Sequence, residues 1–209
     1  MAEDLAQLLV EIKACRRCVE APTGHPLPHA PRPVVRAAAG ARLAVFGQAP
    51  GTRVHHYGIP FLDPSGDRLR EWMGVSAAEF YDETRVAIVP MGFCFPGLDP
   101  KGSDLPPRPE CAPAWRARVL AALPDIEVML LVGQYAQRWH LSTAAQRHRG
   151  SLTETVAGWR EILARPGPIA MFALPHPSWR NTGWINRNPW FETELLPVLR
   201  AEVRRVAGS

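Results

Sequence analysis

The chain has 209 residues, a formal net charge of +4, 22 prolines and four cysteines. This length fits one domain, which we expect to span residues 1–209, and the 46% hydrophobic content excludes a disordered chain. No apolar run approaches the roughly 20 residues of a membrane-spanning helix, and the N-terminus lacks a secretory pattern. We therefore expect a cytoplasmic, monomeric protein with no membrane partner, whose mild basicity permits a polyanionic one.

The first predicted element is a helix, because leucine and isoleucine recur at helical spacing from Leu5 to Ile12. A loop rich in proline and histidine is expected at 20–33. Four uninterrupted apolar runs then predict strands buried on both faces, at 43–46, 86–89, 128–132 and 169–174.

Helices are predicted between and after these strands. Capping-box patterns begin at Ser76 and Ser151, and helix-forming residues fill 109–123 and 192–206. Strands that alternate with helices predict a three-layer α/β/α fold around a central four-stranded, mostly parallel sheet.

Residues that can carry chemistry follow the ends of the predicted strands. A glycine- and proline-rich turn occupies 47–51, a second such segment is 90–94, and Pro175-His176-Pro177-Ser178 follows the last strand. Ligands of open α/β sheets bind at this edge, so we expect the functional site there.

Three features of the sequence have both a structural and a functional interpretation. Phe61, after Pro60, is either a core residue or a fixed face for a flipped base. His176, held between two prolines, is either a satisfied structural histidine or a preorganised hydrogen-bond donor. We expect a loop at 176–188, whose aromatic, cationic and amide side chains suit either solvent or phosphate contacts and base stacking.

The cysteines form one C-x2-C pair, Cys15 and Cys18, and a later C-x16-C pair, Cys94 and Cys111. In a chain without a secretory pattern this spacing indicates a metal site. Four thiolates suit a [4Fe-4S] cluster or a structural zinc ion, and the spacing does not choose between them. Four unrelated thiols are the remaining alternative.

Taken together, these motifs resemble the uracil-DNA glycosylase superfamily, and most closely its iron–sulfur branch, called family 4. The resemblance covers roughly residues 5 to 200. It rests on Gly47-Gln48-Ala49-Pro50-Gly51, Gly58-Ile59-Pro60-Phe61, the four cysteines and His176-Pro177-Ser178. The extension Arg180-Asn181 is similar to the single-strand-selective monofunctional branch.

The resemblance implies excision of uracil from DNA and a role for each matching residue. His176 would stabilise the leaving base, Gln48 and His55 would complete the catalytic set, and Phe61 would stack on the base. Ala49, Met91 and Gly92 would contact the base through their backbone. The expected DNA contacts are Ser178, Trp179, Arg180, Asn181 and Arg187, with Lys101 as a further phosphate contact, and a [4Fe-4S] cluster would bind the four cysteines.

Three departures from family 4 widen the functional hypotheses. Gln48 replaces a glutamate, His55 replaces an aspartate, and the asparagine that reads the uracil edge has no counterpart near Pro90. Hypoxanthine and xanthine in DNA are therefore alternative substrates. A nucleic-acid-binding protein without catalysis, and a redox or sensor protein centred on the cysteines, are the alternatives outside this enzyme class.

Overall fold

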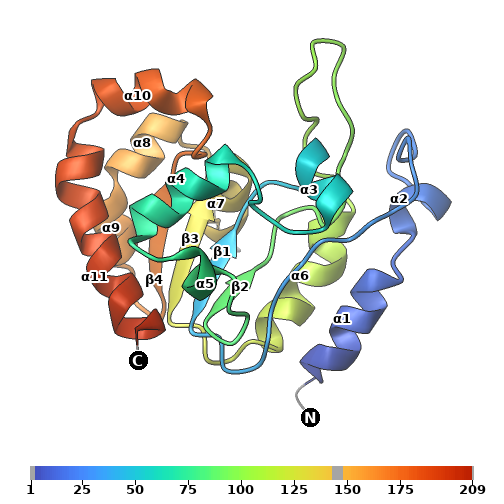
Figure 1. Cartoon of the computed structure of the whole chain (residues 1–209), viewed down its shortest axis with the longest axis horizontal. Helices are drawn as coiled ribbons and strands as arrows, with labels where there is room; N and C mark the ends of the chain where they lie inside the picture. The colour runs from blue at the N-terminus through green and yellow to red at the C-terminus, as the bar shows by residue number, and fades with distance from the viewer. Residues whose placement is uncertain (1–2, 143–147, 209) are drawn as a thin grey trace.

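The computed structural model describes residues 3–142 and 148–208 (Figure 1). Its centre is a sheet of four parallel strands, in the order β2-β1-β3-β4. The strands are β1 (Leu43–Phe46), β2 (Val86–Ile88), β3 (Val128–Val132) and β4 (Ala170–Leu174). The predicted fold class is confirmed, and each predicted strand lies within one residue of its observed bounds.

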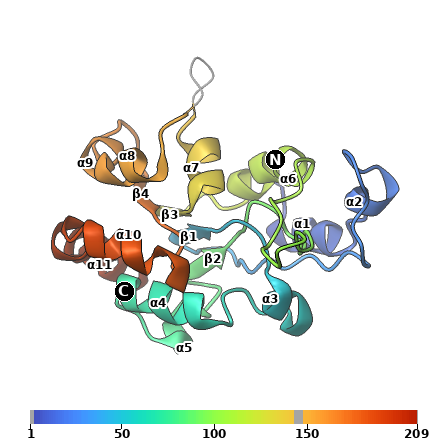
Figure 2. The same ribbon diagram turned by 90° about the horizontal axis from the view of Figure 1, so that it is seen from above.

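Helices cover both faces of the sheet (Figure 2). In the view from above, α4 (Pro64–Met73), α5 (Ala77–Phe80), α10 (Thr182–Arg187) and α11 (Leu196–Ala207) lie on one side. On the other side lie α6 (Cys111–Ala121) and α7 (Gln134–His140), with α1 (Leu5–Lys13) beside α6. The short helices are α2 (Arg17–Glu20), α3 (Thr52–Tyr57), α8 (Leu152–Ala157), α9 (Trp159–Leu163) and the π-helical turn Phe191–Leu195.

The uninterrupted apolar runs form strands because both sheet faces are buried. Val45 and Leu130 point into one hydrophobic cluster, which also contains side chains from α4, α10 and α11. Ala44 and Met129, their neighbours in sequence, point into the opposite cluster with side chains from α1 and α6. Successive residues of a strand alternate between faces, so each face receives an apolar set.

Several local predictions are confirmed. Both capping boxes are present, at Ser76–Glu79 and Ser151–Glu154, and they start α5 and α8. The helix expected from Leu5 is α1, and the segment 21–33 contains no helix or strand. None of the helices within the described residues is long and apolar enough to cross a membrane.

The loop predicted at 176–188 is wrong over most of its length. A 3₁₀ turn spans Trp179–Asn181, and α10 follows directly. Trp184 and Ile185 are buried in the core cluster, and this apolar anchor stabilises a helix whose other residues are polar. The interleaved polar side chains therefore lie on the solvent side of a regular element.

Candidate active site

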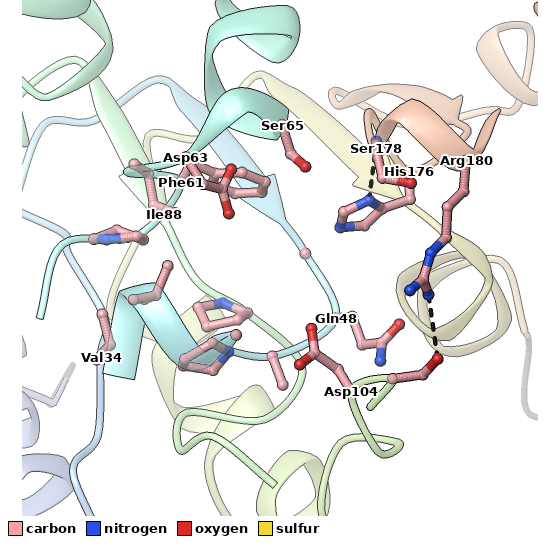
Figure 3. Close-up of a pocket in the computed structure, with 18 of the residues that line it drawn as sticks. Val34, Gln48, Phe61, Asp63, Ser65, Ile88, Asp104, His176, Ser178 and Arg180 are labelled. Carbon is pink, nitrogen blue, oxygen red and sulfur yellow. Dashed lines mark hydrogen bonds between the residues drawn. The ribbon is translucent and has the colours of Figure 1, made fainter. Parts of the chain in front are cut away.

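A cavity of about 410 Å³ opens at the carboxyl edge of the sheet. The turn after β1, the Pro60–Ser65 segment, the 102–104 segment and the 176–180 segment all line it. Figure 3 shows Phe61, Gln48, Asp104 and His176 around this cavity. Its volume is typical of small-ligand pockets, which range from about 300 to 1,000 Å³. The predicted position of the functional site is therefore hollow and lined by polar groups.

His176 is held in one orientation by its own loop. The backbone N–H of Ser178 donates to Nδ1 of His176 at 3.3 Å, and Asn181 Nδ2 donates to the His176 carbonyl at 2.7 Å. Because Nδ1 accepts, the neutral ring carries its proton on Nε2. Burial lowers the pKa of His176, and the nearby Asp63 carboxylate only opposes that shift. The geometry thus presents a neutral histidine with one N–H donor.

Phe61 lies on the cavity wall with an unusual backbone. Its φ of 55° is in the left-handed region, although it is not glycine. Tyr81 Oη donates to the Phe61 carbonyl at 3.1 Å, and the Phe80 ring meets the Phe61 ring edge-on at a centroid distance of 6.0 Å. A strained residue persists only where its surroundings hold it. Here they fix an aromatic face toward the cavity.

The Phe61 ring also explains why position 47 is glycine. A Cβ at Gly47 would stand 3.1 Å from the Phe61 ring edge. The turn after β1 and the aromatic face are therefore in close contact, and a side chain at position 47 would push the ring away.

Gln48 is oriented by a neighbouring loop. Its Nε2 donates to the Leu105 carbonyl at 3.3 Å. This bond assigns the amide, since Nε2 must be the donor, and it leaves Oε1 as an acceptor at the cavity (Figure 3). Gln48 and Ala49 both line the cavity, as expected from the sequence.

Two carboxylates in the cavity were absent from the expected site residues. Asp104 and Asp63 both line it (Figure 3). The pKa of Asp104 is raised because the cavity walls desolvate the carboxylate; Arg180 opposes this shift and Asp63 adds to it. Asp63 also caps α4, and its Oδ1 accepts from the Gly66 N–H at 3.0 Å.

Only one of these two carboxylates could have been predicted from its local sequence. Asp63 precedes Pro64, and Asp followed by proline is a helix-start signal that could have found it. Asp104 has no such signal, because the fold of the 97–105 segment brings it there. The Leu105 N–H donates to the Gly97 carbonyl at 3.0 Å and closes this turn.

Three of the expected catalytic and base-contacting residues, His55, Met91 and Gly92, do not line the cavity. His55 packs instead against His29, at a ring-centroid distance of 4.3 Å, and against Phe95. Its pKa is lowered by burial and by the positive charge of its neighbours. On α3 it is Val54 that reaches the cavity, and the next residue is turned about 100° away.

Met91 and Gly92 also lie behind the cavity wall. The Met91 N–H donates to the Gly47 carbonyl at 2.8 Å, and the Gly92 N–H donates to the Gln48 carbonyl at 2.9 Å. These N–H groups are therefore occupied in holding the turn after β1. Their contribution to the site is to position that turn.

Three of the expected DNA contacts gather around the cavity mouth, and three, Asn181, Arg187 and Lys101, do not line the cavity. Ser178, Trp179 and Arg180 line the cavity, and Trp179 is 76% exposed. Arg180 Nη1 donates to Ser103 Oγ at 3.3 Å and bridges the mouth (Figure 3). Arg187 is exposed at the end of α10 and lies outside the lining, as does Lys101.

The four cysteines meet at a second, much smaller cavity of about 10 Å³. Cys15 and Cys18 come from the α1–α2 segment, Cys94 follows β2, and Cys111 begins α6. Burial raises the pKa of Cys18 to about 11 and the pKa values of Cys94 and Cys111 to about 12. Within residues 3–142 and 148–208, no three His, Cys, Asp or Glu side chains converge closely enough to hold a single metal ion.

A buried arginine near the cysteines bears on whether the four cysteines could hold a negatively charged metal–thiolate centre. Arg116 is 2% exposed, and it donates to neutral acceptors, the Val89 and Pro90 carbonyls and the Met91 sulfur. Burial lowers its pKa to about 10, and Cys111 opposes that shift. Across the described residues no carboxylate forms an ion pair with Arg116. Thiolates around a bound iron or zinc centre would supply the missing negative charge, so the residues fit such a group.

An open parallel sheet with a polar cavity at the carboxyl ends of its strands defines a ligand-binding α/β protein. The comparison with protein families gives the particular class. The model described as the Uracil DNA glycosylase superfamily matches residues 35–200, and the chain belongs to this superfamily. Membership indicates a DNA glycosylase, a hydrolase that removes damaged bases, with DNA as its substrate.

Proposed function

We propose that this chain is a uracil-DNA glycosylase that hydrolyses the N-glycosidic bond of uracil in DNA, leaving an abasic site for base excision repair. The observation that carries the proposal is the pairing, across one cavity, of the neutral His176 donor with the fixed Phe61 ring. A base inside a duplex is out of reach, so the target nucleotide is flipped into the cavity. The enzyme acts as a cytoplasmic monomer of one domain.

Bond cleavage places negative charge on the departing base. The C1′–N1 bond breaks, and its electron pair delocalises over the uracil ring onto O2. His176 Nε2–H donates to O2 and stabilises this anion. Removing one such donor from comparable oxyanion sites costs about 3 kcal/mol of transition-state stabilisation.

Water completes the reaction at the sugar. It attacks C1′ of the positively charged deoxyribose, and Asp104 accepts the proton that the water loses. The base anion takes a proton from solvent as it leaves. Asp104 replaces His55 in this role, because the Asp104 carboxylate lines the cavity and the His55 ring packs elsewhere.

Base recognition rests on Gln48. Its Oε1 accepts from the N3–H of uracil, which cytosine lacks at this position. Hypoxanthine and xanthine also carry a ring N–H beside a carbonyl, so the same acceptor accommodates them. This feature of Gln48 favours a range of deaminated bases as the second candidate function.

The cysteines hold a [4Fe-4S] cluster in this proposal, with structural zinc as the alternative. Four sulfurs that share a cavity without converging on one point favour the larger group. When bound, the cluster supplies a rigid crosslink among the α1–α2 segment, the β2 end and α6. Brown protein with thiolate–iron absorbance supports the cluster, and colourless protein with bound zinc supports the alternative.

The test is base release from oligonucleotides that each carry one damaged base. Uracil-containing DNA is incubated with the protein and then treated with alkali, which cleaves at abasic sites. We expect cleavage at uracil, and a loss of about a hundredfold in rate for His176→Ala with DNA affinity retained. No cleavage by folded wild-type protein, together with DNA binding, supports the alternative of a non-catalytic binding protein.

A further inference from the structure

A third hollow, of about 1020 Å³, lies behind the wall of the active site. It runs between the proline-rich 106–113 segment and the exposed face of α7, with residues 148–149 at one end. We call it the α7 groove. The function proposed above uses none of the side chains on its α7 side.

The α7 side presents two aromatic rings with an arginine between them. Tyr135 is 37% exposed and Trp139 is 41% exposed, whereas neighbours on the inner face of α7 are buried. Tyr135, Arg138 and Trp139 are spaced i, i+3 and i+4, so they project from one side of the helix. Large aromatic side chains kept on a surface indicate a binding face.

The charge of the groove is positive. Arg138 and Arg149 line it, and in the described part of the chain neither is in an ion pair. Arg108 also lines it but pairs with Glu110 at 2.9 Å. No aspartate or glutamate is among the described lining residues. The groove thus offers two uncompensated arginines beside stacking surfaces, a combination that suits an anionic chain with planar groups.

The opposite wall is stiff and joins the groove to the active site. Four prolines, Pro106, Pro107, Pro109 and Pro113, form it. A Cβ on Gly92 would lie 3.0 Å from Pro107 and 3.5 Å from Ala49, which lines the active-site cavity. The two hollows are therefore back to back across this thin wall.

The start of α7 also reaches the catalytic side. A Cβ on Gly133, the residue before α7, would lie 3.9 Å from the His176 Cβ. Figure 2 shows α7 and α6 side by side on one face of the sheet, and the groove is lined by α7 and by the segment at the start of α6.

We propose that the α7 groove binds a stretch of unpaired DNA flanking the target nucleotide, with bases stacked on Tyr135 and Trp139 and phosphates on Arg138 and Arg149. The proposal rests on the DNA glycosylase function. Paired bases do not expose their faces, so the groove favours single-stranded DNA over duplex. A protein segment is disfavoured as the occupant because proline-rich and apolar ligands leave both arginines without a counter-charge.

The test measures binding to fluorescent oligothymidylate of 20 nucleotides, which contains no uracil and is not cleaved. We expect Trp139→Ala to raise the dissociation constant about tenfold, and Trp139→Phe to retain most of the affinity because a ring is still present. Arg138→Gln should weaken binding and reduce the salt slope by about 0.7, the contribution of one phosphate contact to a single strand. Arg204→Gln, an exposed arginine of α11, is the matched control and should bind as wild type does.

A second measurement separates the groove from the function. Uracil release is followed from an oligonucleotide too short to reach the groove, with one nucleotide on each side of uracil. If the groove variants release uracil normally from this short oligonucleotide and also bind oligothymidylate like wild type, the groove proposal is overturned and the enzyme function stands. Wild type that releases no uracil, while Trp139→Ala still weakens binding, overturns the function instead. Self-association that Trp139→Ala abolishes, with unchanged DNA affinity, makes the groove a protein interface and also overturns the proposal.

Discussion

Gly66 gives the sharpest test of how the aromatic wall is built. It lies in the first turn of α4, where alanine is normally the better residue by about 0.5–1 kcal/mol. A Cβ on Gly66, however, would lie 1.8 Å from the Phe61 carbonyl oxygen and 2.9 Å from the Phe61 Cβ. Real Cβ atoms stay beyond 3.0 Å, and the obstacle is backbone that cannot rotate aside.

The helix propensity of alanine would stabilise the protein, whereas the clash of its Cβ with Phe61 would destabilise it. The sign of the change in the free energy of unfolding therefore shows which effect is larger. Overpacking costs about 1–3 kcal/mol, and a shift of backbone belongs at the upper end of that range. Gly66→Ala should therefore lower the free energy of unfolding by about 2–2.5 kcal/mol, the overpacking cost less the helix gain, and lower Tm by about 4–10 °C for a chain of this size.

Gly183→Ala is the matched control, because Gly183 also lies in the first turn of a helix, α10. A Cβ there meets only the Arg187 side chain, at an ordinary 3.5 Å. We expect its Tm to be unchanged or higher by up to about 4 °C. Both variants are measured by thermal and denaturant unfolding.

Base release then connects the packing to function. The displaced Phe61 ring loses its stacking position, and stacking on one base is worth about 1–3 kcal/mol. KM for uracil-containing DNA should rise about tenfold in Gly66→Ala and stay at the wild-type value in Gly183→Ala. Equal stabilisation by both substitutions would refute the close approach of Gly66 to Phe61.

Three further predictions test the surroundings of the cavity. Tyr81→Phe removes the hydroxyl that donates to the Phe61 carbonyl, and should lower the free energy of unfolding by about 1 kcal/mol in denaturant titrations. In wild type the rate of uracil release should fall with decreasing pH, through a pKa above the ordinary aspartate value of about 3.9, because protonation of Asp104 removes the proton acceptor. Asp104→Asn should slow uracil release and abolish this fall at low pH. An unchanged profile in Asp104→Asn would assign the water to another group. Cys111→Ser should reduce bound iron, measured by metal analysis, and lower Tm, and wild-type iron content and Tm would exclude Cys111 as a ligand.

The sequence predicted the sheet well because the signal for a doubly covered strand is local. Val128–Val132 is apolar without interruption, and burial on both faces is what such a run requires. Helix α10 was missed for the opposite reason. Only Trp184 and Ile185 are apolar and buried in it, and their burial depends on a core built from distant segments.

The residues of the candidate site also differ in whether a local sequence signal could predict them. His176, Gln48 and Phe61 lie at the cavity because each follows closely on a strand or a turn that sequence patterns reveal. Asp104 is more than fifty residues from Gln48 and reaches the cavity through the fold of an irregular segment. His55 shows the converse: it is expected in the site because it takes the position of a family 4 aspartate, but the helical rotation of α3 turns its ring toward His29.

One segment, residues 89–94, links the cysteine cavity to the active site. Its Met91 and Gly92 N–H groups hold the turn after β1, its Val89 and Pro90 carbonyls accept from Arg116, and it ends at Cys94. A group bound by the cysteines would neutralise Arg116 and fix both ends of this segment, so its contribution to catalysis would be the placement of Gln48 and Ala49. A sensor that reacts with a dissolved oxidant needs access from solvent; Cys18 and Cys94 are only 7% and 8% exposed, and Cys15 and Cys111 are partly exposed. The connection of Cys94 to the β1 turn through residues 89–94 therefore favours a structural role for any group that the cysteines bind.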